Sequence, residues 1–218
     1  MKHYCLLVLL CTGLLYPQAV SAQEQHTYKV TTGDKLGYET LGWKQTRAGS
    51  LFTTPESRNR YDNYRNQLLW EFRQDTAGSD LTARRTGNTI RLTGTFKRRK
   101  VDKKYTIDPR PWYQYPEYSL RDFVLSGEKR CEFWIISPND LALFEFEACK
   151  MGTETVTLAE RSVKARRVRI KAVGFYGNFW HADYWFSLQD GSYIRYEAVH
   201  GGPGTPPTVK VLISRKGD

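Results

Sequence analysis

The chain has 218 residues and a formal net charge of +10; 40% of its residues are hydrophobic and 14% are aromatic. This length is ample for one domain with a single core. Beyond the N-terminal segment, no apolar run approaches the roughly 18 residues that a membrane-spanning helix requires, which excludes that class of protein.

The N-terminal segment has the pattern of a secretory signal. A basic start precedes the apolar run Tyr4–Leu10, and Val20 and Ala22 are small residues at the two positions that signal peptidase reads. We expect residues 1–22 to be a signal peptide cleaved after Ala22, so that the protein is periplasmic or secreted. A lipoprotein signal is disfavoured, because a leucine and not a small residue precedes Cys11.

After cleavage only two cysteines would remain, in an oxidising compartment. Cys131 and Cys149 lie on the apolar runs Cys131–Ile136 and Leu141–Cys149, which the turn cluster Ser137–Asp140 joins. A hairpin would bring the two cysteines nearly opposite one another, so we predict a Cys131–Cys149 disulfide. Two unpaired thiols are the alternative if the register differs.

The positive charge is concentrated in two regions of the chain. In an exported protein, the anionic partners would be lipid headgroups, lipopolysaccharide or acidic polysaccharide, and nucleic acid is excluded by location. The alternative is a solvated strand face whose charges keep sheet edges from pairing. The residues are Arg84, Arg85, Arg91, Lys97, Arg98, Arg99, Lys100, Lys103 and Lys104 in one region, and Arg161, Lys164, Arg166, Arg167, Arg169 and Lys171 in the other.

Alternating polar and apolar residues, separated by turn signals, predict strands along most of the chain. Thr53–Asn66 is the exception in the first half, because its Pro, Arg and Asn residues predict an irregular or weakly helical connection. The expected strands are Thr27–Thr32, Lys35–Arg47, Gln67–Gln74, Leu81–Arg85, Thr89–Phe96, Lys97–Ile107, Cys131–Ile136, Leu141–Cys149, Thr153–Leu158, Val163–Val173, Phe179–Leu188, Ser192–Val199 and Thr208–Ser214.

The strand rhythm breaks in the middle of the chain. Asp108–Pro116 holds three prolines, which bar regular ladder bonding and predict a segment that crosses the sheet or lies at its edge. Ser119–Leu125 follows as the one expected helix, with Ser119 as its cap and an apolar face of Leu120, Phe123 and Val124. That face would plug one end or one open side of the sheet.

The stretch Gly174–His200 has the pattern of a long β-hairpin rich in aromatic residues. Asp190 and Gly191 supply the tight turn, because glycine tolerates the positive φ that such turns demand. Even-numbered residues should face the core or a ligand cavity, and odd-numbered ones should face away. The even set includes Trp180, Tyr184 and Phe186, and the odd set includes His181 and Asp183.

These elements predict a mainly β fold. We expect residues 23–218 to form a single antiparallel β domain of about eleven strands, curled into a half-barrel or barrel, with one short helix near Ser119–Leu125. No helix and strand alternation, and no internal repeat, points to another architecture.

At Gly174–Gly191 and Gly201–Gly204 the chain resembles uncharacterised exported bacterial proteins of the domain-of-unknown-function type. Such proteins are similar in layout to the LolA-like lipoprotein-carrier group. The resemblance implies a half-barrel whose apolar concave face wraps around acyl chains. It assigns no functional residue to this sequence position by position.

The preferred hypothesis is an exported, non-enzymatic protein that binds or carries an apolar or lipid-like ligand in a concave sheet, without a cofactor or metal. Apolar residues on both faces of strands, as at Phe133–Ile136, exceed what a sheet with one wet face needs. The candidate ligand-binding residues are Trp180, Tyr184, Phe186, Trp134 and Trp112.

Two alternatives stay open. An envelope hydrolase could use His181, Asp183 and His200, which would have to converge within hydrogen-bond reach; a metal held by His181 and Asp183 would need His26 or His200 as a third ligand. A structural or interaction module of the cell envelope would instead pack its aromatic residues inside and use its edge strands for partners. No recognisable hydrolase or nucleotide-binding motif is present.

Overall fold

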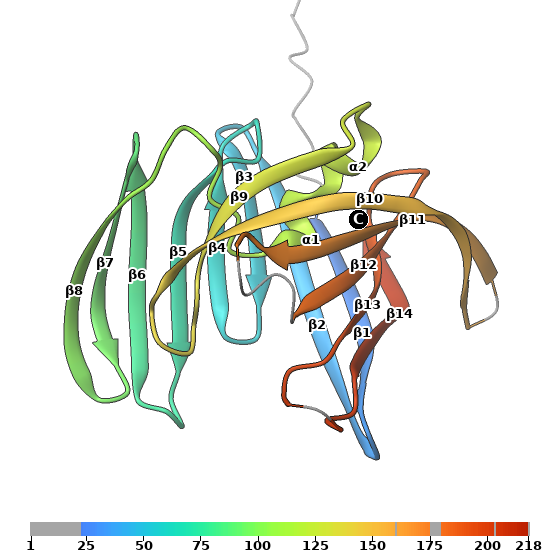
Figure 1. Ribbon diagram of the computed structural model, residues 1–218, viewed down its shortest axis with the longest axis horizontal. Coiled ribbons are helices and arrows are strands. Elements are labelled where there is room, and N and C mark those ends of the chain that lie inside the picture. The colour runs from blue at the N-terminus through green and yellow to red at the C-terminus, as the bar shows by residue number, and fades with distance from the viewer. Residues whose placement is uncertain (1–22, 160, 175–179, 203, 218) are drawn as a thin grey trace, which may run out of the picture.

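The computed structural model describes residues 23–159, 161–174, 180–202 and 204–217, so the predicted signal peptide and residues 175–179 of the predicted hairpin lie outside the described residues. The described chain forms one antiparallel sheet and two short helices (Figure 1). The strands are β1 (Gln23–Thr32), β2 (Lys35–Thr46), β3 (Gly49–Thr54), β4 (Ser57–Tyr61), β5 (Gln67–Gln74), β6 (Ser79–Thr86), β7 (Thr89–Phe96), β8 (Arg99–Thr106), β9 (Arg130–Ile136), β10 (Leu143–Leu158), β11 (Arg161–Ala172), β12 (His181–Ser187), β13 (Tyr193–Ala198) and β14 (Thr208–Gly217).

The order of the strands is simple. It runs β8-β7-β6-β5-β4-β3-β2-β1-β14-β13-β12-β11-β10-β9, so each strand pairs with its neighbour in sequence and the two terminal strands meet in the middle. The sheet curves strongly but does not close, because β8 and β9 remain its two edges. The predicted mainly β fold with a single antiparallel sheet is therefore confirmed in its half-barrel form.

The segment between the two edge strands fills the hollow of the curved sheet. It contains α1 (Pro116–Ser119) and α2 (Arg121–Leu125), which lie between the two halves of the sheet in Figure 1. Leu120, Phe123 and Val124 are buried, as the expected apolar face requires. The expected cap is wrong: Ser119 is the last residue of α1, and the N-cap of α2 is Leu120, which makes no side-chain hydrogen bond.

Two apolar clusters hold the sheet around this segment. The first joins both helices to strands on either side of the hollow, with rings such as Tyr28, Phe52, Phe133 and Phe186 fully or almost fully buried. The second lies between β5–β7 and β9, around the fully buried Trp70 and Trp112. The concave side of the sheet is thus packed by the chain's own side chains along most of its length.

The prediction of an irregular connection over Thr53–Asn66 is wrong, because this region contributes the end of β3 and all of β4. Ser57, Asn59 and Tyr61 face inward on β4, and two of these three residues are polar. Asn59 is fully buried, and its amide donates to Ser57 at 3.0 Å and accepts from Gln67 at 2.8 Å. Buried polar groups are tolerated when they are hydrogen-bonded, so the strand lacks the apolar alternation used to find strands.

The strand count of about eleven is also too low, and the strands expected at Leu141–Cys149 and Thr153–Leu158 are one strand, β10. The register shift between Lys150 and Gly152 is a bulge, through which β10 continues as one strand.

The predicted disulfide is absent, and both cysteines are free. Cys131 lies opposite Ala148, whereas Cys149 lies opposite Arg130. Directly opposed residues share a face, so this offset of one residue points the two thiols to opposite faces of the hairpin.

Candidate functional site

Five aromatic side chains from neighbouring strands line the concave side of the sheet and are here called the aromatic wall: Tyr28, Tyr184, Phe186, Tyr193 and Tyr196. Strand register brings them together, since Tyr184 pairs with Tyr196 and Phe186 pairs with Tyr193. The ring centroids of Tyr184 and Tyr196 are 4.9 Å apart, as are those of Tyr28 and Tyr193. All five residues are at most 8% exposed.

The expected alternation of β12 is observed in part. Phe186 and Tyr184 on the even-numbered side are buried in the core and His181 on the odd-numbered side is exposed, but the odd-numbered Asp183, Trp185 and Ser187 are buried as well. Trp180 is half-buried just before β12, where its ring lies 6.1 Å from that of Phe146 and its indole donates to Val199 O. These three predicted ligand-binding residues therefore lie in or next to the aromatic wall.

The other two predicted ligand-binding residues lie elsewhere. Trp112 is fully buried in the second cluster, where its indole donates to Gln114 at 3.0 Å. Trp134 is half-buried and donates to Asp108 at 3.0 Å, under the guanidinium of Arg110. The structure does not bring these tryptophans into the wall, because both pack in the second apolar cluster.

The expected convergence of His181, Asp183 and His200 is not observed. Asp183 is held by Arg167 and Arg169 at 2.6 and 2.9 Å, and although burial opposes this effect, these arginines lower its pKa. His200 instead contacts Tyr196 at 2.8 Å, on the opposite face of the sheet. The hydrolase hypothesis that required these three residues to converge is therefore contradicted. Within the described ranges, no group of three or more His, Cys, Asp or Glu residues could hold a metal ion.

The hollow next to His181 is lined mainly by groups that are already engaged. It has a volume of about 240 Å³ and is lined in part by Asp183 and Glu197. Glu197 pairs with Arg195 at 2.6 Å, and Asp183 pairs with the arginines of β11. We assign no ligand to this hollow.

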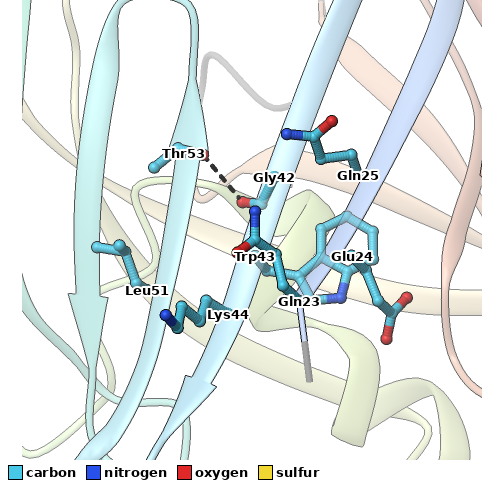
Figure 2. Close-up of a pocket in the computed structure, with 8 residues that line it drawn as sticks. All are labelled: Gln23, Glu24, Gln25, Gly42, Trp43, Lys44, Leu51 and Thr53. Carbon is cyan, nitrogen blue, oxygen red and sulfur yellow. Dashed lines mark hydrogen bonds between the residues drawn. The ribbon is translucent and has the colours of Figure 1, made fainter. Parts of the chain in front are cut away.

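A second small pocket lies where β1, β2 and β3 run side by side. Figure 2 shows its lining, with the hydrogen bond from Thr53 to Gly42 O at 3.2 Å across its wall. Its volume is about 160 Å³, and polar side chains such as Gln23 and Lys44 form much of its rim. That volume is too small for an extended apolar chain.

Sequence reasoning missed Glu117, the one acidic residue of α1. Its Oε2 is buried, and no hydrogen-bond partner reaches it from the described residues. Burial raises the pKa of the Glu117 carboxyl above its ordinary value, against the opposing influence of Lys210. No sequence signal marks this residue, since a glutamate in a first helical turn is ordinarily a solvated, dipole-stabilising group.

The helices α1 and α2 share the first apolar cluster with the aromatic wall and are here called the cover. Neither has a side-chain cap. Arg65 pairs with Asp122 at 2.7 Å and stacks over Tyr118, and the Arg121 guanidinium lies over the Trp43 ring. Apolar packing therefore supplies most of what keeps the cover in place.

Comparison with solved structures supports the fold. The chain is similar to a β-barrel-like protein of domain of unknown function DUF1849 from Brucella abortus, with 8% identity and a TM-score of 0.55 over 90% of this chain and 98% of that one. Other matches are the hypothetical lipoprotein YmcC from Escherichia coli, at 13% identity and TM-score 0.40 over 87% and 83% of the chains, and a LolA superfamily protein from Nitrosomonas europaea, at 8% identity and TM-score 0.25 over 92% and 87%.

The DUF1849 protein is of the uncharacterised kind that the sequence resemblance led us to expect. At such low identity the likeness to the DUF1849 protein shows the fold alone. No protein-family model matches the chain, and no curated protein is similar to it in sequence. No helix in the described ranges is long and apolar enough to cross a membrane.

Proposed function

We propose that this protein is an exported, non-enzymatic binding or carrier protein that holds an apolar or lipid-like ligand against the aromatic wall, beneath α1 and α2. The observation that carries the proposal is the pairing of a continuous aromatic surface with a cover of four and five helical residues. Helices this short are not stable on their own, so the cover depends on the surface that it packs against.

Replacement of the cover by a ligand on the aromatic wall is energetically feasible. Lifting the cover would expose apolar groups of Tyr118, Leu120, Phe123 and Val124. An acyl chain bound in their place would bury about 0.8 kcal/mol worth of surface per methylene, which offsets that exposure over a chain of ordinary length. The hydrogen bonds from Tyr118 to Ser50, from Arg65 to Asp122 and from Arg121 to Asp190 O would have to break.

We further propose that the protein contacts an anionic component of the cell envelope, and the basic strand β8 supports this proposal. Arg99, Lys100 and Lys104 are exposed there and belong to none of the ion pairs of the described residues. The interaction-module alternative has less support. Basic residues blunt the free edge of β8, while the backbone of Pro111 and Tyr113 covers the edge of β9 through bonds to Trp134.

A binding titration with delipidated protein tests the proposal. Dodecanol should displace a fluorescent fatty-acid probe in a saturable manner. Ala198 is a small, buried residue beside the wall, so Ala198→Phe should fill the space and weaken dodecanol binding about tenfold or more. Thr40→Phe adds the same ring at an exposed site on the other face and should leave binding unchanged.

Circular dichroism would establish that both variants are folded. Absence of saturable displacement from the wild-type protein, or equal dodecanol affinity in folded Ala198→Phe, would contradict the proposal.

A further inference from the structure

Glu117 is an acidic side chain whose charge is not compensated within the protein. Its Oε2 is buried without a hydrogen-bond partner, and no basic side chain of the described residues lies within ion-pair distance of it. Its own backbone N–H is the one group nearby that favours its charged form by hydrogen bonding. Glu117 as a whole is half-buried, but its Oε2 is shielded from solvent and lacks a partner, so this oxygen calls for an explanation.

The carboxylate lies beside the aromatic wall. After burial itself, the charge of Glu117 is the largest influence that raises the pKa of the Tyr28, Tyr184, Tyr193 and Tyr196 hydroxyls. The Tyr193 hydroxyl is likewise buried without a hydrogen-bond partner among the described residues. Two unpartnered polar atoms therefore occur here, the Tyr193 hydroxyl on the wall and Glu117 Oε2 on α1.

The nearest candidate for an internal counter-ion is already engaged. Lys210 reaches the concave side from β14, but its ammonium pairs with Glu39 at 2.5 Å. Both partners of this pair are only about one-quarter exposed, so separating them to serve Glu117 would leave Glu39 unpaired in its turn. The fold thus leaves the Glu117 carboxyl of α1 without an ion-pair partner among the described residues.

We propose that the ligand of the aromatic wall is an amphiphile with a cationic amine head, whose ammonium pairs with Glu117 while its apolar chain lies along the wall. This inference rests on the proposed function and adds the chemical class of the ligand. An ammonium would donate a charge-assisted hydrogen bond to the carboxylate, which neutral amphiphiles cannot form as strongly. Tyrosine faces add a cation–π attraction that favours the same charge.

The test compares three amphiphiles of equal chain length on the delipidated protein at neutral pH: dodecylamine, dodecanol and dodecanoate. Dodecylamine should bind about tenfold or more tightly than dodecanol, the size of one charge-assisted hydrogen bond, and dodecanoate should bind more weakly than dodecanol. Glu117→Gln should remove the preference for the amine and leave dodecanol affinity unchanged.

Glu128→Gln is the matched control, because it makes the same change of net charge at an exposed residue after α2 and should keep the preference. Glu117→Gln should also raise the thermal midpoint, since it removes a buried charge without a partner, and Glu117→Leu provides a second folded variant for the same comparison.

Equal affinities for dodecylamine and dodecanol in the wild-type protein would overturn the amine inference and leave the proposed function standing. The inference would also fall if the preference survived in Glu117→Gln and Glu117→Leu, or disappeared in Glu128→Gln. If none of the three amphiphiles bound, the proposed function itself would be overturned.

Discussion

The guanidinium of Arg110 stacks on the indole of Trp134, with 4.8 Å between the guanidinium carbon and the ring centroid. The same guanidinium pairs with Asp108 at 2.6 Å, with Glu132 at 2.9 Å and with Glu145. One side chain therefore ties the crossing segment to both strands of the β9–β10 hairpin. Three carboxylates that could have looked like an acidic site are instead the ligands of an arginine.

We expect Arg110→Ala to lower the urea midpoint of unfolding, because it leaves three carboxylates without their shared partner and uncovers Trp134. Arg110→Met, which keeps the packing stem, should recover part of the loss. Arg73→Ala is the control: Arg73 also pairs with a carboxylate, Asp75, but both are more than two-thirds exposed, so its removal should have little effect. Equal midpoints for Arg110→Ala and Arg73→Ala would contradict this role.

Gly49 should be the least replaceable glycine of the sheet's first half. Its φ is +132°, and an added Cβ would lie 1.9 Å from the backbone oxygen of Tyr61. Gly49→Ala should therefore lower the free energy of unfolding by about 3 kcal/mol or more. Gly87 also has a positive φ, of +56°, but has open space around it, so Gly87→Ala should cost about 1 kcal/mol. Chemical denaturation of both variants measures the two losses in the free energy of unfolding. A smaller loss for Gly49→Ala than for Gly87→Ala would contradict this prediction.

His26 should make the protein less stable in mild acid. It is fully buried, and burial together with the charge of Arg215 lowers its pKa from 6.5 to about 4, although Glu24 opposes the shift. Above pH 6.5 the ring is neutral in both states. As the pH falls from 6.5 toward 4, the unfolded chain takes up a proton that the folded protein does not, so stability falls by about 3 kcal/mol as an order of magnitude.

The charged groups around His26 are Glu24, Arg215 and Arg121, and Tyr28 lies 3.4 Å from its Nδ1. The substitution His26→Gln removes this titration. The difference in stability between the wild-type protein and the variant should therefore change between pH 6.5 and 4 and level off below pH 4. Thermal melts at several pH values measure the difference. A constant difference between pH 7 and 4 would show that His26 is not the titrating group.

The two cysteines should react as free thiols in the folded, oxidised protein. Burial, with a contribution from Cys149, raises the pKa of the Cys131 thiol to about 12, so we expect Cys131 to be alkylated more slowly than the less buried Cys149. A reductant should leave the thermal midpoint unchanged. A disulfide across this hairpin would contribute about 3 kcal/mol, so a midpoint that drops on reduction would show that the bond forms.

The structural features that could be predicted from the sequence are those marked by a regular pattern of apolar residues or by prolines. The inward-facing Tyr184 and Phe186 and the buried face of α2 follow from the spacing of apolar residues, and the crossing segment follows from its prolines. The burial of Asp183 and Ser187 on the other side of β12 does not follow from that spacing. Asn59 and Gln67 were missed because they are buried in pairs of hydrogen bonds, which no single-strand pattern reveals. The disulfide prediction failed by one residue of register, which the sequence of a hairpin with a six-residue connection does not define.

The residues of the candidate site likewise divide into those that sequence spacing placed correctly and those that it did not. Tyr184 and Phe186 could be placed on the concave face from their spacing, whereas Trp112 and Trp134 were assigned by residue type alone and lie outside the wall. Glu117 has no spacing signal at all, since its isolation depends on Lys210 being paired with Glu39 on strands far away in sequence.

Native mass spectrometry of the protein isolated from the periplasm, without detergent or organic solvent, tests the central claim most directly. We expect a population that is heavier than the bare polypeptide by the mass of an amphiphilic molecule. Organic extraction should remove this molecule, and the Ala198→Phe variant should lack it. A single species at the polypeptide mass, unchanged when dodecanol or dodecylamine is added to the extracted protein, would contradict a ligand-binding role for the aromatic wall.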